Sequence, residues 1–166
     1  MKILSVFSTT TLFIGLSMGM AQAAENMKMG NSMKMEEEKL TYGEPGIASE
    51  VDRTITVNLE DIAYDLKKLD IKNGETIRFK IVNKDETEHE FTLGTAESQA
   101  ADRIKMAKQA DAGESMAMTE PNSVSVGELE TKELIWKFAG PETIEFACNV
   151  PGHYEAGMSG VITILK

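Results

Sequence analysis

The chain contains only two histidines and one cysteine, and all three can be assigned to a single metal site. Cys148, His153 and Met158 follow one another with four residues in each gap, and His89 lies further upstream. One thiolate, two imidazoles and one thioether are the ligands of a type 1 copper centre, in which two His and one Cys form a plane and Met binds weakly along the axis. The types and spacing of these residues therefore indicate a copper-binding site.

The mixture of ligands also indicates which metal is bound. Imidazole nitrogen suits copper(II), whereas thiolate and thioether sulfur suit copper(I), so a mixed site lets the metal change oxidation state with little rearrangement. Zinc also binds Cys and His and is the main alternative, but a thioether is a poor zinc ligand. Taken singly, each of these residues would more often be a packing residue. Their combination favours one centre that cycles between Cu(I) and Cu(II).

The segments around these residues must position them, and most alternate polar and apolar side chains, which is typical of half-buried strands. Residues 72–75, Lys-Asn-Gly-Glu, are typical of a hairpin turn. Residues 96–112 lack the alternation and stop at Gly113, which predicts one short helix inserted between strands. Short strands separated by turns predict an all-β protein with a β-sandwich fold. The strands are expected at 54–59, 62–66, 76–83, 89–93, 123–126, 134–138, 143–148 and 160–165.

A sandwich of this kind can bring the four residues together. The strand that ends at Cys148 and the strand that begins near Gly160 are expected to be neighbours, so that the loop between them carries Cys, His and Met to one end of the sandwich. His89 is expected to come from an adjacent strand on the core side. Pro151 stiffens the loop, and Gly157 and Gly160 are expected to permit its turns.

The first 23 residues are typical of a secretory signal peptide. Lys2 gives a positive start, residues 3–20 are mostly apolar, and Ala21-Gln22-Ala23 is a small-x-small cleavage site. An uncleaved anchor helix is the alternative, but no stop-transfer flank follows. We therefore expect export to the periplasm, a mature chain that starts at Ala24, and no membrane attachment after cleavage.

Residues 24–50 have few β-branched residues and almost no aromatic ones, which predicts a flexible Met-rich leader before a domain at 51–166. Several methionines occur there as Met-x-Met pairs, and thioethers are soft donors that favour copper(I). The alternative is a chance feature of a linker. The methionine Met106, on the expected helix, is predicted to lie in the core instead. The possible additional copper(I) ligands are Met27, Met29, Met33 and Met35, and in a later loop Met116 and Met118.

Charge and cysteine content exclude several classes of function. The formal net charge is −10, which argues against binding to nucleic acid or to an anionic membrane surface. An exported chain with a single cysteine cannot form a disulfide within itself. Since Pro-Gly-His follows closely after Cys148, a metal ligand is favoured over an inert buried thiol and over a disulfide between chains.

The region from about Val51 to Lys166 resembles the cupredoxins, the azurin–plastocyanin superfamily. The resemblance rests on Asn83, on His89-Glu90-Phe91, and on the loop from Cys148 to Met158 with Gly160 behind it. The loop, with four residues in each gap, is similar to those of rusticyanin and auracyanin. The resemblance implies an antiparallel Greek-key sandwich whose equatorial ligands are His89, Cys148 and His153 and whose axial ligand is Met158.

The resemblance also implies a route for electrons. In this family the edge of the His at the position of His153 protrudes through a small apolar patch, which Val150, Pro151, Ala156 and Gly157 would form here. The combination of a Met-rich leader and a periplasmic cupredoxin further resembles the CopI-type copper-tolerance proteins.

Other copper proteins and enzymes can be excluded. A binuclear copper site needs a second cysteine in the loop, but Gly152 occupies the position four residues after Cys148. Multicopper oxidases and nitrite reductases need further histidines, commonly one beside the cysteine, where this chain has Asn149. The sequence also lacks a Ser-His-Asp arrangement and a phosphate-binding Gly loop. We therefore expect no enzymatic activity.

Three functions fit these features. The first is a periplasmic copper-tolerance protein that acts through copper binding and one-electron redox. The second is a soluble electron carrier between respiratory complexes, with a partner such as a c-type cytochrome or an oxidase. The third is a non-redox binding module with a vestigial site. The Met-rich leader favours the first, because a simple shuttle has no need of one, and we expect a monomer.

Overall fold

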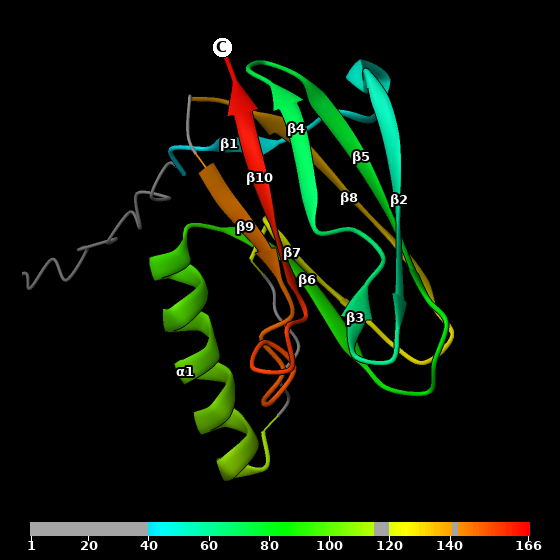
Figure 1. Ribbon diagram of the computed structural model, residues 1–166, viewed down its shortest axis with the longest axis vertical. Helices are drawn as coiled ribbons and strands as arrows, with labels where there is room; N and C mark the ends of the chain where they lie inside the picture. Colours follow the sequence, from blue (N-terminus) through cyan, green and yellow to red (C-terminus); the bar gives the residue numbers. More distant parts are fainter. Residues whose placement is uncertain (1–39, 115–119, 141–142) are drawn as a thin grey trace, which may run out of the picture. The chain divides into compact units, whose positions relative to one another are not determined.

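The computed structural model describes residues 40–114, 120–140 and 143–166, which form two β-sheets, one α-helix and a short 3-10 helix (Figure 1). The elements in chain order are β1 (Gly43–Pro45), a 3-10 helix (Ala48–Glu50), β2 (Arg53–Glu60), β3 (Ala63–Tyr64), β4 (Lys68–Lys72), β5 (Thr76–Asn83), β6 (His89–Gly94), α1 (Ala96–Ala112), β7 (Ser123–Val126), β8 (Thr131–Phe138), β9 (Thr143–Ala147) and β10 (Ser159–Leu165).

The strands form two sheets of five. The first has the order β1-β8-β5-β2-β3, and the second has the order β4-β10-β9-β6-β7. The predicted β-sandwich with one inserted helix is therefore confirmed. Two details differ from expectation: the described residues form more strands than the sequence indicated, and β2–β5 and β4–β10 are parallel pairs in a sheet system that was expected to be antiparallel.

Aromatic rings fill the space between the sheets. Phe79 on β5 and Phe91 on β6 come from different sheets, and their ring centroids lie 5.1 Å apart. Phe91 stacks on Phe146 of β9 at 5.5 Å, and all three side chains are fully buried. Each such ring contributes about 1.5–3 kcal/mol through removal of apolar surface from water. This packed layer fixes the positions at which β6 and β9 emerge at one end of the sandwich.

Helix α1 begins and ends where the sequence predicted. Thr95 caps its N-terminus by accepting a hydrogen bond from the Ser98 backbone N–H, and Gly113 ends it in the left-handed conformation at φ 69°. Gln99 and Met106 are its buried residues, and the helix contacts β6 and β9 of the second sheet. The prediction that Met106 lies in the core is confirmed.

The turn at residues 72–75 is not a hairpin. The Glu75 N–H donates to the Lys72 carbonyl, and Gly74 takes a positive φ of 85°, so the local turn forms as its residues predict. However, β4 before it pairs with β10 and β5 after it pairs with β2 and β8. The turn therefore carries the chain from one sheet to the other, a choice that depends on distant strands and not on the turn sequence.

The structure also corrects part of the expected leader. Within residues 40–50, Tyr42 is 2% exposed and belongs to the core, and β1 pairs with β8 so that Pro45 lies opposite Trp136. The signal peptide and the methionines at 27, 29, 33, 35, 116 and 118 lie outside the described residues. In the part of the chain that is described, no helix is long and apolar enough to cross a membrane.

Candidate metal centre

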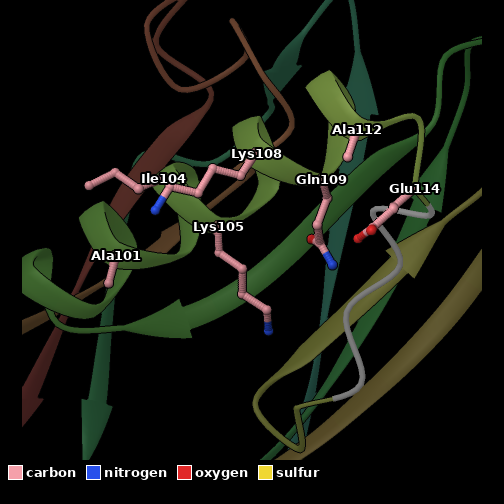
Figure 2. Close-up of a pocket in the computed structure, with 7 residues that line it drawn as sticks. All are labelled: Ala101, Ile104, Lys105, Lys108, Gln109, Ala112 and Glu114. Atoms are coloured by element: carbon pink, nitrogen blue, oxygen red, sulfur yellow. The ribbon is translucent and has the colours of Figure 1, made fainter.

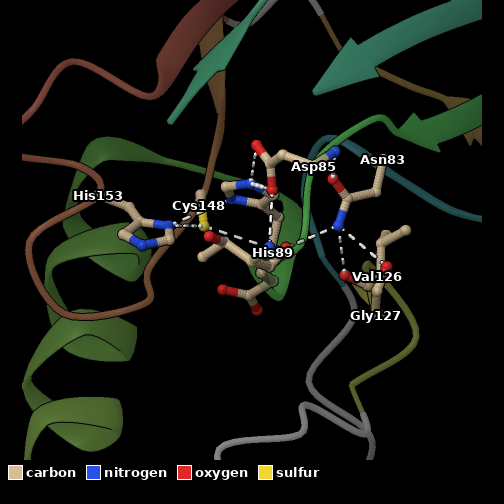
Figure 3. Close-up of polar contacts among 9 residues, drawn as sticks. Asn83, Asp85, His89, Val126, Gly127, Cys148 and His153 are labelled. Atoms are coloured by element: carbon tan, nitrogen blue, oxygen red, sulfur yellow. Dashed lines mark hydrogen bonds and ion pairs between the residues drawn. The ribbon is translucent and has the colours of Figure 1, made fainter. Parts of the chain in front are cut away.

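Three of the predicted ligands meet at one end of the sandwich (Figure 3). His89 is the first residue of β6, Cys148 directly follows β9, and His153 lies in the loop from β9 to β10. The Nδ1 atom of His153 lies 3.3 Å from the Cys148 Sγ and 3.3 Å from the His89 Nδ1. The ligand atoms of all three lie within 4.8 Å of one another.

The four predicted ligands differ slightly in how exposed their side chains are to solvent. His89, Cys148 and Met158 are fully buried, and His153 is 8% exposed, so His153 is the ligand nearest to solvent. Met158 closes the loop against the core, because its N–H donates to the His153 carbonyl at 3.0 Å and its carbonyl accepts from the Cys148 N–H at 3.1 Å. Of the apolar residues expected around His153, those at 151, 156 and 157 are exposed and Val150 is half-buried.

The loop conformation follows from strand pairing and from two glycines. Pairing of β9 with β10 places Ala147 opposite Ser159, which brings the two ends of the loop together as predicted. Gly152 and Gly157 have positive φ values of 88° and 93°, which favour glycine. The expectation that Gly160 permits a turn is wrong: it lies within β10, opposite Phe146.

The Cys148 thiol is held in a dry environment. Its Sγ accepts a hydrogen bond from the Glu90 backbone N–H at 3.3 Å. Burial raises the pKa of this thiol to about 12, although the backbone hydrogen bonds act in the opposite direction. At neutral pH the thiol is therefore protonated, and a metal must displace the proton to bind the sulfur.

Both imidazoles can present a free Nδ1 toward the sulfur. Burial, and then the neighbouring His89, lower the pKa of His153, which keeps this ring neutral. The Nε2 atom of His89 lies 3.1 Å from each carboxylate oxygen of Asp85. Burial acts to raise the pKa of Asp85, but hydrogen bonds from Thr87 and His89 outweigh it and lower that pKa.

A buried carboxylate that the sequence analysis missed lies behind the sulfur. Glu90 is 1% exposed and accepts hydrogen bonds from the hydroxyls of Thr92 and Ser123. Its other oxygen accepts a hydrogen bond at 3.0 Å from the backbone N–H of Asn149, the residue directly after Cys148. Burial raises the pKa of Glu90, against the effect of these hydrogen bonds. The carboxyl thus ties β6 and β7 to the start of the ligand loop.

Asn83, at the end of β5, holds the opposite side of the site. Its Nδ2 donates to the carbonyls of Thr87 at 2.7 Å and Gly127 at 2.9 Å, and its Oδ1 accepts from the Asp85 N–H at 3.1 Å. These bonds join the loop before His89 to the segment after β7 (Figure 3).

Helix α1 lies beside the ligand loop and binds it at two points (Figure 1). The fully buried Gln99 donates to the Thr92 carbonyl at 2.8 Å and accepts from the Asn149 Nδ2 at 2.7 Å. One turn further along, the Arg103 guanidinium lies 3.6 Å above the centre of the Tyr154 ring. The loop is thus held by Glu90 of β6 and by two side chains of the helix.

The outer side of α1 carries a separate surface pocket of about 470 Å³ (Figure 2). Its lining contains none of the side chains of the metal centre, and none of its lining residues is a His, Cys or Met. The pocket is lined by Ala101, Ile104, Lys105, Lys108, Gln109, Ala112 and Glu114.

Residues 51–165 match the family described as copper-binding proteins of the plastocyanin/azurin family. The chain belongs to this family. This match confirms the cupredoxin resemblance inferred from the sequence and identifies the chain as a copper-binding protein. The chain is also similar to two proteins named copper-resistant cuproprotein CopI. The one from Rubrivivax gelatinosus is 37% identical over 74% of this chain and 73% of its own length. The one from Pseudomonas aeruginosa is 33% identical over 74% and 82%.

Solved structures show the same fold for this cupredoxin. Auracyanin B has a TM-score of 0.60 at 22% identity, covering 75% of this chain and 97% of its own. The auracyanin of Roseiflexus castenholzii has a TM-score of 0.57 at 24% identity, covering 70% and 99%.

The side chains of this cupredoxin fit its family's metal. A thiol and two imidazole nitrogens converge in a dry cluster, and this donor set suits copper in both oxidation states. The described part of the chain contains one such cluster, which matches the single copper centre predicted.

Proposed function

We propose that the protein holds one copper ion through His89, Cys148, His153 and Met158 and contributes to copper tolerance in the periplasm. The observation that carries the assignment is the convergence of the first three side chains within 4.8 Å in a buried site. When bound, the copper supplies one-electron chemistry between Cu(I) and Cu(II). The protein is proposed to act as a binding and redox protein rather than as an enzyme.

Each residue of the proposed site has its own role in holding the metal. Cys148 gives up its proton to become a thiolate, and the Glu90 N–H offers that sulfur a hydrogen bond that moderates its charge. Burial and the neighbouring His89 lower the pKa of His153 and so favour its neutral form, which can bind a metal through a ring-nitrogen lone pair. The buried Met158 excludes water and brings a thioether to the same end of the sandwich.

The tolerance role is supported by two independent features. The relatives described above are named copper-resistant cuproproteins. The N-terminal segment carries a signal-peptide pattern followed by Met-x-Met pairs, which suits capture of copper(I) after export.

Metal binding is tested by titrating the purified mature protein with copper(II) and recording its visible and paramagnetic resonance spectra. We expect an intense thiolate-to-copper band that saturates at one equivalent and is absent from Cys148→Ser. Met158→Leu should shift the band and the reduction potential, whereas Met106→Leu, which changes a buried methionine on α1, should shift neither. A wild-type protein without this band would refute the ligand assignment.

The tolerance role is tested by growth in excess copper after deletion of the gene. Complementation should require Cys148. A truncation of residues 24–39, rather than the whole segment to residue 50, tests the methionines while it keeps Tyr42 and β1 in the sandwich. Growth that is unaffected by the deletion would refute the role.

A soluble electron carrier is the second candidate. The observation that favours it is that His153 is the least buried of the four predicted ligands, at 8% exposed, and lies in the same loop as the exposed residues Pro151, Ala156 and Gly157. A c-type cytochrome or an oxidase is the proposed partner. Stopped-flow mixing of the reduced protein with each should show rapid reoxidation, and its absence with all respiratory partners would exclude this role.

A further inference from the structure

Asp85 contacts His89, one of the proposed copper ligands, through its carboxylate. It lies in the loop between β5 and β6, and both of its carboxylate oxygens lie 3.1 Å from the Nε2 of His89 (Figure 3). His89 is fully buried, whereas the Asp85 side chain is 24% exposed. The other ring nitrogen of His89, Nδ1, faces His153.

The carboxylate is fixed in place and is not a mobile surface acid. Its Oδ1 accepts a hydrogen bond from the Thr87 N–H at 2.8 Å, and its own backbone N–H donates to the Asn83 side chain at 3.1 Å. Its carbonyl accepts from the Leu129 N–H at 3.1 Å. The acid is thus aimed at the imidazole by bonds that do not involve the metal ligands.

A carboxylate in this position determines which nitrogen of the ring carries the proton. A carboxylate can only accept hydrogen bonds, so Nε2 must carry a proton, and in the neutral ring Nδ1 is left with its lone pair. A carboxylate–histidine–metal arrangement also makes the imidazole more electron-rich. The added negative charge stabilises the more positive state of a bound metal.

We propose that Asp85 is a positioning residue that holds His89 with Nδ1 free for the metal and biases the site toward copper(II). This inference rests on the copper-binding function proposed above, and it adds a determinant of the relative affinity for the two oxidation states.

Two substitutions test the role of Asp85. Asp85→Asn removes the charge and keeps the oxygen that accepts from the Thr87 N–H, but it places an amide N–H donor where the second oxygen lies 3.1 Å from Nε2. Asp85→Ala removes both the charge and the acceptor. Asp52→Asn is the matched control, because the Asp52 carboxylate also accepts a backbone N–H, from Thr76, at the far end of β5.

The first measurement uses the metal-free protein and nitrogen NMR of the His89 ring. Wild type and Asp52→Asn should show the single tautomer with the proton on Nε2, and Asp85→Ala should show a mixture of tautomers. The same single tautomer in Asp85→Ala would overturn the positioning role. Because no copper is present, this result stands even if the wild-type protein fails to bind the metal.

The second measurement compares copper(II) and copper(I) affinities by competition with chelators. Loss of an outer partner of a metal-bound His typically lowers affinity about 10–100-fold. We expect a loss of that order for copper(II) in both Asp85 variants, with a smaller loss for copper(I). An affinity ratio in Asp85→Asn equal to that of Asp52→Asn would overturn the electrostatic bias. If Asp85→Ala does not fold, the Asn variant decides the charge effect alone.

Discussion

Gly160 offers a quantitative test of how the sandwich positions the ligand loop. It lies in β10 directly opposite Phe146 of β9, two residues before Cys148. A Cβ atom at Gly160 would lie 2.1, 2.6 and 2.7 Å from three atoms of the Phe146 ring, whereas ordinary contact begins at 3.4 Å. The glycine is therefore needed for the space it leaves and not for a turn.

The Phe146 ring is enclosed by other aromatic side chains. Phe146 is fully buried, and its centroid lies 5.3 Å from that of Tyr64 and 5.5 Å from that of Phe91. Overpacking of this kind costs about 1–3 kcal/mol. Alanine is intrinsically favoured over glycine within a strand by about 0.5–1 kcal/mol, so any observed loss in Gly160→Ala understates the steric cost.

Urea unfolding of the metal-free protein measures this cost. We expect Gly160→Ala to lower the free energy of unfolding by about 1–3 kcal/mol, and to lose at least about 1 kcal/mol less in a Phe146→Leu background. Gly127→Ala is the control, because its Cβ would meet only the Glu130 carboxylate at 3.4 Å and its change should stay within about 0.5 kcal/mol. Equal losses in both backgrounds would refute the steric explanation.

Three further results are expected. Because burial raises the pKa of Cys148 to about 12, copper(II) binding near neutral pH should release one thiol proton, seen with an indicator dye and absent in Cys148→Ser. Gln99→Leu should lower the free energy of unfolding by about 1–3 kcal/mol for each buried group left unpaired, and should speed copper loss to a chelator, because Asn149 loses its acceptor. Burial acts to raise the pKa of Glu75, but hydrogen bonds from Arg53 and from backbone lower it below 4.5. Its stabilisation is therefore present above about pH 4.5 and is lost as pH falls through the lowered value, so Glu75→Gln should flatten the acid limb of a melting-temperature profile.

The ligand loop could be predicted from the sequence because its chemistry is local. The spacing of Cys148, His153 and Met158 lies within one stretch of chain, and the alternating strands on each side bring its ends together. The inserted helix was equally local, since Thr95 and Gly113 mark its ends. Patterns of this kind need no knowledge of distant partners.

The outer partners of the ligands could not be predicted in the same way. Glu90 lies in β6, where every residue is buried, so the polar–apolar alternation of a half-exposed strand does not apply. One face of β6 meets the aromatic core, its two edges pair with β7 and β9, and α1 also contacts it. A carboxyl at such a position has no sequence signal beyond its own polarity. Asp85 precedes His89 by four residues, but that spacing alone does not indicate that the two side chains meet.

The boundary of the domain was missed for a related reason. Tyr42 is buried, and its hydroxyl donates to the Leu93 carbonyl at 3.1 Å, which joins it to the end of β6. Its ring packs on Trp136 with centroids 5.9 Å apart. A short edge strand such as β1 has little β-branched character of its own, so the surrounding composition suggested a leader. Its stability comes from the partner strand and not from its own propensity.

The hydrogen bonds around the loop explain how the site can be prepared before a metal arrives. Glu90 of β6 binds the backbone N–H of Asn149, directly after Cys148, and Gln99 of α1 binds the side chain of the same residue. Lys67 adds a third restraint, because its ammonium donates to the Gly157 carbonyl at 2.8 Å near the other end of the loop. A loop restrained at both ends loses little conformational entropy when a ligand binds. The inserted helix therefore supports the metal centre as the strands do. Without its contacts, one side of the loop would be free to move when the metal changes oxidation state.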